Sequence, residues 1–325
     1  MSTLPQTGVS FVIPIYNEEG SLPELRRQLV AAGEKLGETF EIILIDDGST
    51  DGSFPALKKM QAEDPRIKVI RLRKNFGQTA ALSAGFDYAR GEIVITLDAD
   101  LQNDPADAAI LVSKLREGYD IVSGWRQKRK DKFLTKRLPS KMANWLISRI
   151  TRVRLRDYGC TLKAYRRDVL RSIKLYGEMH RFIPAIASQI GVAIAEVPVN
   201  HRPRLYGESK YKLTKSVRVF LDLLTVKFLL SYSTRPLQIF GLFGLISGGV
   251  GGVLALVLSY QRLFLKQSIA NRPLLLLAIL LMVIGFQFVS MGLLGEIMVR
   301  TYHEAVEKHI YAVREVLDSE PGAAL

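Results

Sequence analysis

The sequence predicts an α/β domain with a mainly parallel sheet, followed near the C-terminus by a hairpin of two membrane-spanning helices. Two observations support this fold class. Short β-rich runs alternate with helical stretches over residues 1–125, and two long segments without charged residues lie after residue 235. Because 48% of the 325 residues are apolar, the chain can form a large core and a smaller second part.

Four short runs rich in Val, Ile and Leu predict buried strands, at Val9–Ile15, 41–45, 67–71 and 92–97. Helical stretches lie between them, including Leu22–Leu36 and 78–89. Such alternation favours a parallel sheet, whose ligands bind at the carboxyl ends of the strands. Three polar clusters follow predicted strands at that edge: Tyr16-Asn17-Glu18, Asp46-Asp47-Gly48-Ser49 and Asp98-Ala99-Asp100.

The formal net charge of +13 comes from one part of the chain. Residues 121–175 contain 17 Lys and Arg residues against 3 acidic residues, which predicts an anionic partner. Nucleic acid and anionic lipid both fit this charge, and the neighbouring segments must decide between them. The single cysteine, Cys160, excludes an internal disulfide, and no secretory signal precedes the first strand. We therefore expect the bulk of the protein in the cytoplasm.

Two stretches after the sheet, at residues 138–150 and 213–228, carry an apolar face opposite Lys and Arg residues. Both core-facing helices and helices in the membrane interface have this pattern. Their position before the apolar segments favours the interface.

The two uncharged segments cover residues 236–260 and 273–294, and with 25 and 22 residues each is long enough to cross roughly 30 Å of hydrocarbon. A short loop joins them, so both ends of the hairpin are predicted on one side, and the flanking Lys and Arg residues favour the inner side. Gly244, Gly248 and Gly252 recur at four-residue spacing, which permits close helix packing within the hairpin or between chains of a homo-oligomer, such as a tetramer.

The predicted organisation has four parts. A cytoplasmic α/β domain covers residues 1–212, and an interfacial helix covers 213–235. Two transmembrane helices, 236–260 and 273–298, follow within 236–298. A cytoplasmic tail covers 299–325.

A metal site is predicted directly after the fourth strand. Asp98, Asp100 and Gln102 supply two carboxylates and an amide oxygen, which suit a hard divalent ion such as Mg²⁺ or Mn²⁺. Such an ion neutralises the diphosphate of a leaving nucleotide. An isolated Asp-x-Asp is more often a cap or a solvated loop, so this assignment depends on the neighbouring clusters.

The clusters after the first two strands predict a nucleotide pocket. Tyr16 can stack on a base, and Asp47 can accept a hydrogen bond from a base N–H. No Gly-x-Gly-x-x-Gly follows a strand, which disfavours a dinucleotide-binding dehydrogenase. The other residues assigned to nucleotide-sugar binding are Pro14, Asn17, Glu18, Gly77, Asp98 and Arg126.

A phosphate-binding element is predicted at residues 204–210, immediately before the second amphipathic stretch. Arg204 and Lys210 bracket a glycine that lets the backbone approach a phosphate, and Ser209 adds a hydroxyl. Arg137 is assigned to the same acceptor phosphate, and Arg126 to the leaving diphosphate. A basic turn and solvated surface arginines are the alternatives. The position before two spans favours a lipid phosphate.

These motifs resemble those of the inverting family 2 glycosyltransferases, which have the GT-A fold. That family carries a P-x-Y-N-E start, a D-D-G-S turn and a D-x-D at successive strand ends. The R-x-x-G-x-S-K element, matched here by Arg204, Gly207, Ser209 and Lys210, is similar to that of the polyprenyl-phosphate glycosyltransferases.

The resemblance implies a GT-A domain that uses a UDP-sugar, a divalent metal cofactor and a polyprenyl phosphate acceptor such as undecaprenyl phosphate. It also implies a multi-pass enzyme of the bacterial inner membrane with its catalytic domain in the cytoplasm. Its product would serve cell-envelope glycan or lipid A modification, and nucleic acid would not be a partner.

The expected reaction is a single inverting displacement in which Asp100, Asp157, Arg204 and Lys210 act as catalytic residues. Several relatives carry an acid where this sequence has Cys160. A phosphate monoester is already ionised at neutral pH and needs no such base, so Cys160 is better explained as a small buried residue and Asp157 as a residue that orients the acceptor or a sugar hydroxyl.

Two other functions fit parts of the pattern. A processive polysaccharide synthase uses a similar nucleotide pocket, but its Q-x-x-R-W element is absent here. A catalytically inactive nucleotide-sugar-binding scaffold at the membrane is disfavoured by the intact metal and phosphate motifs.

Overall fold

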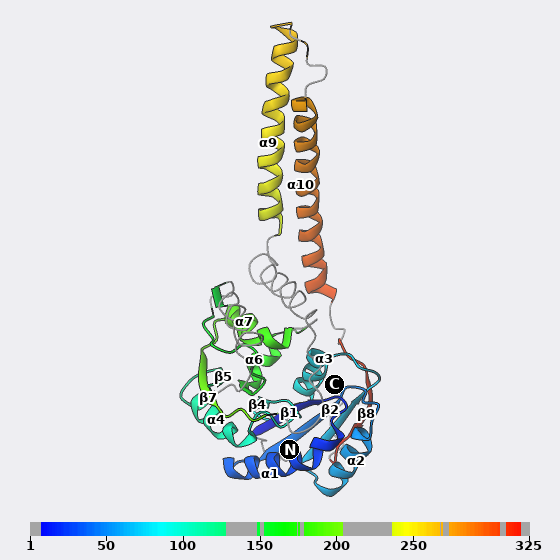
Figure 1. Ribbon diagram of the computed structural model, residues 1–325, viewed down its shortest axis with the longest axis vertical. Helices are drawn as coiled ribbons and strands as arrows, with labels where there is room; N and C mark the ends of the chain where they lie inside the picture. Colours follow the sequence, from blue (N-terminus) through cyan, green and yellow to red (C-terminus); the bar gives the residue numbers. More distant parts are fainter. Residues whose placement is uncertain are drawn as a thin grey trace. The chain divides into compact units, whose positions relative to one another are not determined.

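The computed structural model describes residues 8–127, 148–149, 153–173, 175, 179–203, 236–266, 268, 273–305 and 310–319. They belong to two compact units, Met1–Leu223 with His309–Leu325 and Leu224–Lys308. The first unit is an α/β domain and the second is a pair of long helices (Figure 1).

One sheet forms the centre of the first unit, with the strand order β7-β5-β6-β4-β1-β2-β3-β8. The four strands predicted from the sequence lie next to one another in the order β4-β1-β2-β3 and run parallel. β6 and β8 run antiparallel to their neighbours, whereas β7 is parallel to β5. The fold class is therefore confirmed, with antiparallel strands added outside the parallel centre. The strands are β1 Val9–Ile15, β2 Phe40–Asp46, β3 Ile67–Leu72, β4 Ile93–Thr96, β5 Ile121–Arg126, β6 Lys163–Arg166, β7 Ile194–Val199 and β8 Val313–Leu317.

Helices lie on both faces of the sheet (Figure 1). α1 contacts α2 and α4 on one face, and α3 contacts α6 and the 3₁₀ turn Met179–Phe182 on the other. Side chains of β1 alternate between the two helix layers. Phe11 belongs to the core beneath α1, and Val12 lies against Gly85 of α3. Strands covered on both faces are apolar throughout, which explains why the sequence signal for β1 to β4 is strong. The helices are α1 Leu22–Leu36, α2 Ser53–Glu63, α3 Gln78–Tyr88, α4 Ala108–Arg116, α6 Arg167–Arg171 and α7 Ile183–Ala187.

The C-terminal residues return to the sheet as strand β8. β8 pairs antiparallel with the edge strand β3, and the backbone N–H of Arg73 donates to the Ala312 carbonyl at 2.9 Å. The amino-acid sequence predicted only a tail at residues 299–325. The sequence VREVL is short and two of its five residues are charged, as suits an edge strand with one solvated side, so its pattern does not distinguish it from a loop.

The second unit consists of α9 (Pro236–Leu263) and α10 (Pro273–Ala305). By length and composition, Phe240–Leu263 and Pro273–Gly295 are able to cross a membrane. The helices pack closely, because a Cβ on Gly285 would lie 2.6 Å from the Gly248 nitrogen and 2.7 Å from the Gly244 oxygen. Two of the three glycines at four-residue spacing are thus used within the hairpin, and nothing lies within 4 Å of a Cβ placed on Gly252.

The two predicted interfacial stretches lie outside the described residues, apart from Ser148 and Arg149. The same holds for Arg137 and for the predicted phosphate-binding residues Arg204, Ser209 and Lys210.

Candidate active site

The candidate site lies at one edge of the sheet, where six strands end. β5 runs in the same direction as β4 because both are antiparallel to β6, and β7 is parallel to β5. The carboxyl ends of β1 to β5 and of β7 therefore meet at a single edge. This topology brings together the loops that sequence reasoning assigned to the nucleotide and the metal.

The metal motif follows β4 in a tight loop. Leu101 takes a φ of 60°, and the backbone N–H of Gln102 donates to Asp100 Oδ1 at 3.2 Å. Gln78 Nε2, at the start of α3, donates to Asp98 Oδ1 at 2.7 Å. Burial and the neighbouring Asp100 carboxylate raise the pKa of Asp98 to about 6. The loop thus holds two carboxylates whose charges repel each other.

This pair of carboxylates fits a divalent cation. A cation between Asp98 and Asp100 would remove the repulsion that raises the pKa of Asp98. Among the described residues, no three carboxylate, imidazole or thiol side chains converge on one point. The donor set of the chain is therefore incomplete in the described part and suits an ion that takes further oxygens from a bound molecule.

Asp47 fixes the loop before α3. Its Oδ1 accepts from the Phe76 N–H at 2.7 Å, and its Oδ2 accepts from the Gly77 N–H at 2.9 Å. Gly77 has a φ of 94°, which explains why a glycine stands there. Burial raises the pKa of Asp47 to about 6. The predicted nucleotide residues Asp47 and Gly77 therefore contact each other directly.

The loops after β1 and β2 also hold each other. Asn17 Oδ1 accepts from the Thr50 N–H at 2.8 Å, and the Asn17 N–H donates to Ser49 Oγ at 3.0 Å. The Glu18 N–H donates to Ser53 Oγ at 3.0 Å. Tyr16 is partly exposed beside them, whereas Pro14 lies within β1, opposite Ile45 of β2.

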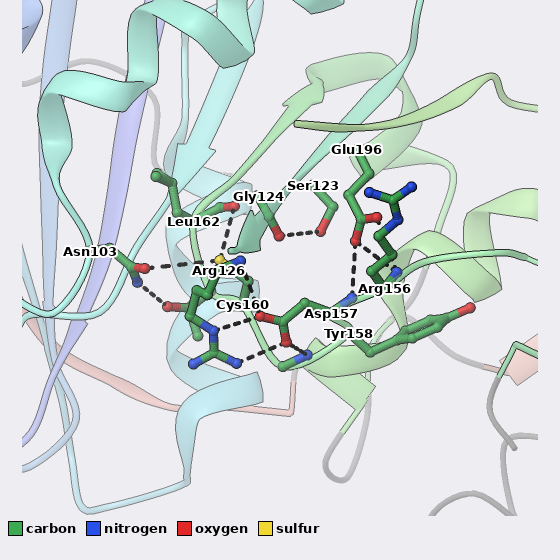
Figure 2. Close-up of polar contacts among 12 residues, drawn as sticks. Asn103, Ser123, Gly124, Arg126, Arg156, Asp157, Tyr158, Cys160, Leu162 and Glu196 are labelled. Carbon is green, nitrogen blue, oxygen red and sulfur yellow. Dashed lines mark hydrogen bonds and ion pairs between the residues drawn. The ribbon is translucent and has the colours of Figure 1, made fainter. Parts of the chain in front are cut away.

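Arg126 and Asp157 form a bidentate ion pair (Figure 2). Arg126 Nε lies 2.6 Å from Asp157 Oδ2, and Arg126 Nη2 lies 2.8 Å from Asp157 Oδ1. The Asp157 side chain is almost fully buried, and its Oδ1 also accepts from the Gly159 N–H at 3.2 Å. Asp157 therefore orients an arginine at the end of β5, and the structure brings together two residues to which the sequence assigned separate roles.

A buried lysine, Lys163, lies behind this pair. Its Nζ donates to the carbonyl oxygens of Cys160 and Tyr158, which are in the turn that carries Asp157. Burial lowers the pKa of Lys163, and the Asp157 and Asp98 carboxylates oppose that effect. Burial also raises the pKa of the Cys160 thiol to about 11, so Cys160 is a neutral core residue at physiological pH, as the sequence indicated.

The segment after β7 is attached to the metal loop. His201 forms an isolated antiparallel bridge with Asn103, and the Arg202 N–H donates to the Gln102 carbonyl at 2.8 Å. The Arg202 guanidinium also contacts the Asp104 carboxylate and lies 2.9 Å from Gln28 Oε1. The predicted phosphate-binding element begins two residues after Arg202, at the first residue outside the described segment.

Three residues of the site were not predicted from the sequence: Gln78, Lys163 and Glu196. Gln78 contacts Asp98, Lys163 supports the Asp157 turn, and Glu196 accepts hydrogen bonds from the backbone of that turn. Gln78 follows a glycine at the start of a predicted helix, and this position at a strand-to-helix loop could have marked it as a site residue. Lys163 and Glu196 lie within strands, where one polar residue is ordinarily solvent-facing, so only their burial and partners distinguish them.

Comparisons with known proteins show the family to which the chain belongs. Residues 10–174 match the model of the family described as Glycosyl transferase family 2. The chain is 41% identical over 319 residues to a dodecaprenyl-phosphate galacturonate synthase of Rhizobium johnstonii, covering 97% of this chain and 94% of that protein.

Solved structures share the fold. A glucosyl-3-phosphoglycerate synthase from Mycobacterium tuberculosis, in complex with Mn²⁺, UDP and phosphoglyceric acid, aligns with a TM-score of 0.52 and 20% identity over 68% of this chain and 78% of that one. A mannosyl-3-phosphoglycerate synthase from Rubrobacter xylanophilus aligns with a TM-score of 0.55 and 15% identity over 68% and 74%. The fold, the strand-end site and the family match lead to one conclusion: the chain belongs to glycosyl transferase family 2 and is a glycosyltransferase.

Proposed function

We propose that this enzyme transfers a sugar from a UDP-sugar to a polyprenyl phosphate, such as undecaprenyl phosphate, at the inner face of a bacterial inner membrane. One observation carries the proposal. The Asn103 to His201 bridge and the hydrogen bond from Arg202 to Gln102 hold residues 201–202, which lie just before the predicted phosphate-binding element in the sequence, against the metal loop. This attachment supports an acceptor phosphate that binds beside a donor held by Asp98 and Asp100.

The donor half of the site consists of residues at the strand ends. Tyr16 and Asp47 would bind the base, and Asp98, Asp100 and Gln102 would hold Mg²⁺ or Mn²⁺. When bound, this ion neutralises charge on the leaving diphosphate. Arg126, held by Asp157, would bind the same diphosphate. The solved relative with Mn²⁺ and UDP shares this fold, which supports a metal and nucleotide donor.

The acceptor half of the site is inferred from the sequence motif at residues 204–210 and from the similarity to the dodecaprenyl-phosphate galacturonate synthase. Arg204, Ser209 and Lys210, with Arg137, would bind the acceptor phosphate, whose oxygen then attacks C1 of the sugar. The bond from C1 to UDP breaks as the new bond forms, so UDP leaves and the anomeric configuration inverts. Positioning supplies part of the rate, because the phosphate enters at the membrane surface where the hairpin holds the enzyme.

The alignment with the dodecaprenyl-phosphate galacturonate synthase over 97% of the chain favours transfer of one sugar to a polyprenyl phosphate over polymer synthesis. The product would serve cell-envelope glycan or lipid A modification. Several sequence runs also resemble transferases of 4-deoxy-4-formamido-L-arabinose, so both sugars belong in a donor panel.

The test uses full-length protein purified in detergent, with undecaprenyl phosphate, Mn²⁺ and a panel of labelled UDP-sugars that includes UDP-galacturonate and UDP-4-deoxy-4-formamido-L-arabinose. Label extracted into organic solvent as a single-sugar lipid supports the proposal. An aqueous polymer would instead show a synthase, and nucleotide binding without turnover would show an inactive scaffold. Asp100→Ala should abolish transfer without unfolding the protein, whereas full activity in this variant would refute the metal assignment.

A further inference from the structure

Glu196 in β7 accepts hydrogen bonds from two consecutive backbone N–H groups of the neighbouring loop. Its Oε1 lies 2.9 Å from the Arg156 nitrogen and 3.0 Å from the Asp157 nitrogen, and its Oε2 lies 3.1 Å from the Arg156 nitrogen. Figure 2 shows the Glu196 carboxylate facing the loop at Arg156 and Asp157. The charged acceptor makes these bonds stronger than those between neutral groups.

The same loop is attached to the end of β5 by two further contacts. The Arg156 guanidinium lies 4.4 Å from the centre of the Trp125 ring, and Asp157 forms the bidentate pair with Arg126. A Cβ on Gly159 would lie 3.1 Å from Arg126 Nη2, so the loop closes tightly around the guanidinium. The loop is thus fixed from β7 through Glu196 and from β5 through Trp125 and Arg126.

Arg126 ends β5 at the edge of the sheet where Asp98 follows β4. A free arginine side chain samples many rotamers, and a fixed carboxylate partner removes that freedom before any ligand binds. The Asp157 carboxylate can act in this way only while its own backbone stays in place.

We infer that Glu196 is a positioning residue that acts through Asp157 to hold the Arg126 guanidinium toward the diphosphate of the nucleotide donor. The inference rests on the proposed function for the identity of that donor. Glu196 would not touch the substrate. Its removal should therefore weaken recognition of the second phosphate and leave recognition of the base, ribose and first phosphate unchanged.

The experiment compares the binding of UDP and UMP to full-length protein in detergent with Mn²⁺, by titration calorimetry. Arg126→Ala should lower the affinity for UDP about tenfold, as loss of a charge-assisted hydrogen bond predicts, and change the affinity for UMP less than about twofold. Glu196→Ala should lower the affinity for UDP about threefold to fivefold, and it should also change the affinity for UMP less than about twofold. Glu196→Gln keeps an acceptor oxygen for both N–H groups and should stay within about twofold of wild type for UDP.

The double variant provides the decisive comparison. If Glu196 acts only through Arg126, Arg126→Ala with Glu196→Ala should bind UDP no more weakly than Arg126→Ala alone. Additive losses would overturn the inference, and so would equal weakening of UDP and UMP in Glu196→Ala, which indicates a general structural role. A wild-type protein with no preference for UDP over UMP would also overturn it.

Glu41→Ala is the matched control for loss of stability. Glu41 is likewise a partly buried glutamate that accepts a backbone N–H, from Arg90 at 2.7 Å, but it lies at the start of β2, away from the strand ends that form the site. Its loss should leave the ratio of UDP to UMP affinity unchanged. The labelled transfer assay on the same preparations separates the two ideas: absence of lipid product in wild type refutes the proposed function, whereas additivity with active wild type refutes only the role of Glu196.

Discussion

Asp98 and Asp47 have pKa values raised to about 6, chiefly by burial, yet their hydrogen bonds differ. Asp98 Oδ1 accepts from the Gln78 side chain, which an asparagine at 98 could also accommodate. Each Asp47 oxygen accepts from a backbone N–H, and an asparagine amide offers only one acceptor oxygen. The same substitution should therefore have opposite effects on stability at the two positions.

Asp98→Asn should stabilise the metal-free protein at neutral pH. An acid whose pKa rises on folding binds more protons in the folded state, so its contribution to the free energy of unfolding falls as pH rises from 3.8 through about 6. The gain in unfolding temperature over wild type, measured with EDTA by tryptophan fluorescence, should be larger at about pH 8 than at about pH 4.5. Both tryptophans belong to the first unit, so the signal reports on it. A gain that does not change with pH would contradict the raised pKa.

Asp47→Asn should destabilise the first unit by about 1–3 kcal/mol, because one buried backbone N–H at Phe76 or Gly77 loses its acceptor. Denaturant unfolding followed by tryptophan fluorescence measures this difference. Asp51→Asn, in the exposed turn nearby, serves as the comparison. Equal unfolding midpoints for wild type and Asp47→Asn would show that the carboxylate is not needed to hold the loop before α3.

At the scale of elements, β8 covers an edge that β3 would otherwise expose. Asp318 follows β8, and its Oδ2 lies 3.0 Å from Lys68 Nζ and 3.2 Å from Arg90 Nη2. The Lys68 side chain is only 5% exposed, and Glu41 lies 3.7 Å away as its second partner. The C-terminal segment therefore supplies half of the charge that compensates a buried ammonium group in the sheet.

Asp318→Ala should lower the free energy of unfolding by about 1–3 kcal/mol, less than the loss of a sole partner because Glu41 remains. Glu315→Ala is the control, since Glu315 is exposed on the same strand. Thermal unfolding of both variants beside wild type measures the effect. If Asp318→Ala matches Glu315→Ala, the interaction of Asp318 with Lys68 does not stabilise the sheet.

In the whole chain, the pairing of β8 with β3 means that both ends of the helical hairpin connect to the first unit. The polypeptide leaves the first unit before α9 and re-enters the same sheet after α10. If both helices cross a membrane, the residues on either side of the hairpin must lie on the same side as the sheet, and the loop after α9 on the other. The two apolar segments and their flanking charges predicted that both ends of the hairpin lie on one side of the membrane, and the pairing of β8 supports this independently.

Together with the proposed cytoplasmic position of the first unit, this topology predicts the labelling of single cysteines by a membrane-impermeant maleimide. Ser268→Cys, in the loop after α9, should react in intact spheroplasts, whereas Ser319→Cys should react only after the membrane is opened. The wild-type protein serves as the control for background labelling, because its one cysteine, Cys160, is buried and has a pKa raised to about 11. Labelling of Ser319→Cys in intact spheroplasts would contradict the predicted orientation.

β1 to β4, α1, α3 and the two long apolar helices could be predicted from the amino-acid sequence, because strands covered on both faces, and helices long enough to cross a membrane, are apolar over their whole length. The sequence also placed Asp47 and Asp98 at strand ends, since the alternation of strands and helices implies a shared edge. The contacts that join these parts are visible only in the folded protein: the Arg126 to Asp157 pair held by Glu196, the attachment of Arg202 to the metal loop, and β8 against β3. Each of these joins residues at least 31 positions apart, and a pattern of polar residues in one chain contains no information about which distant partner will compensate it.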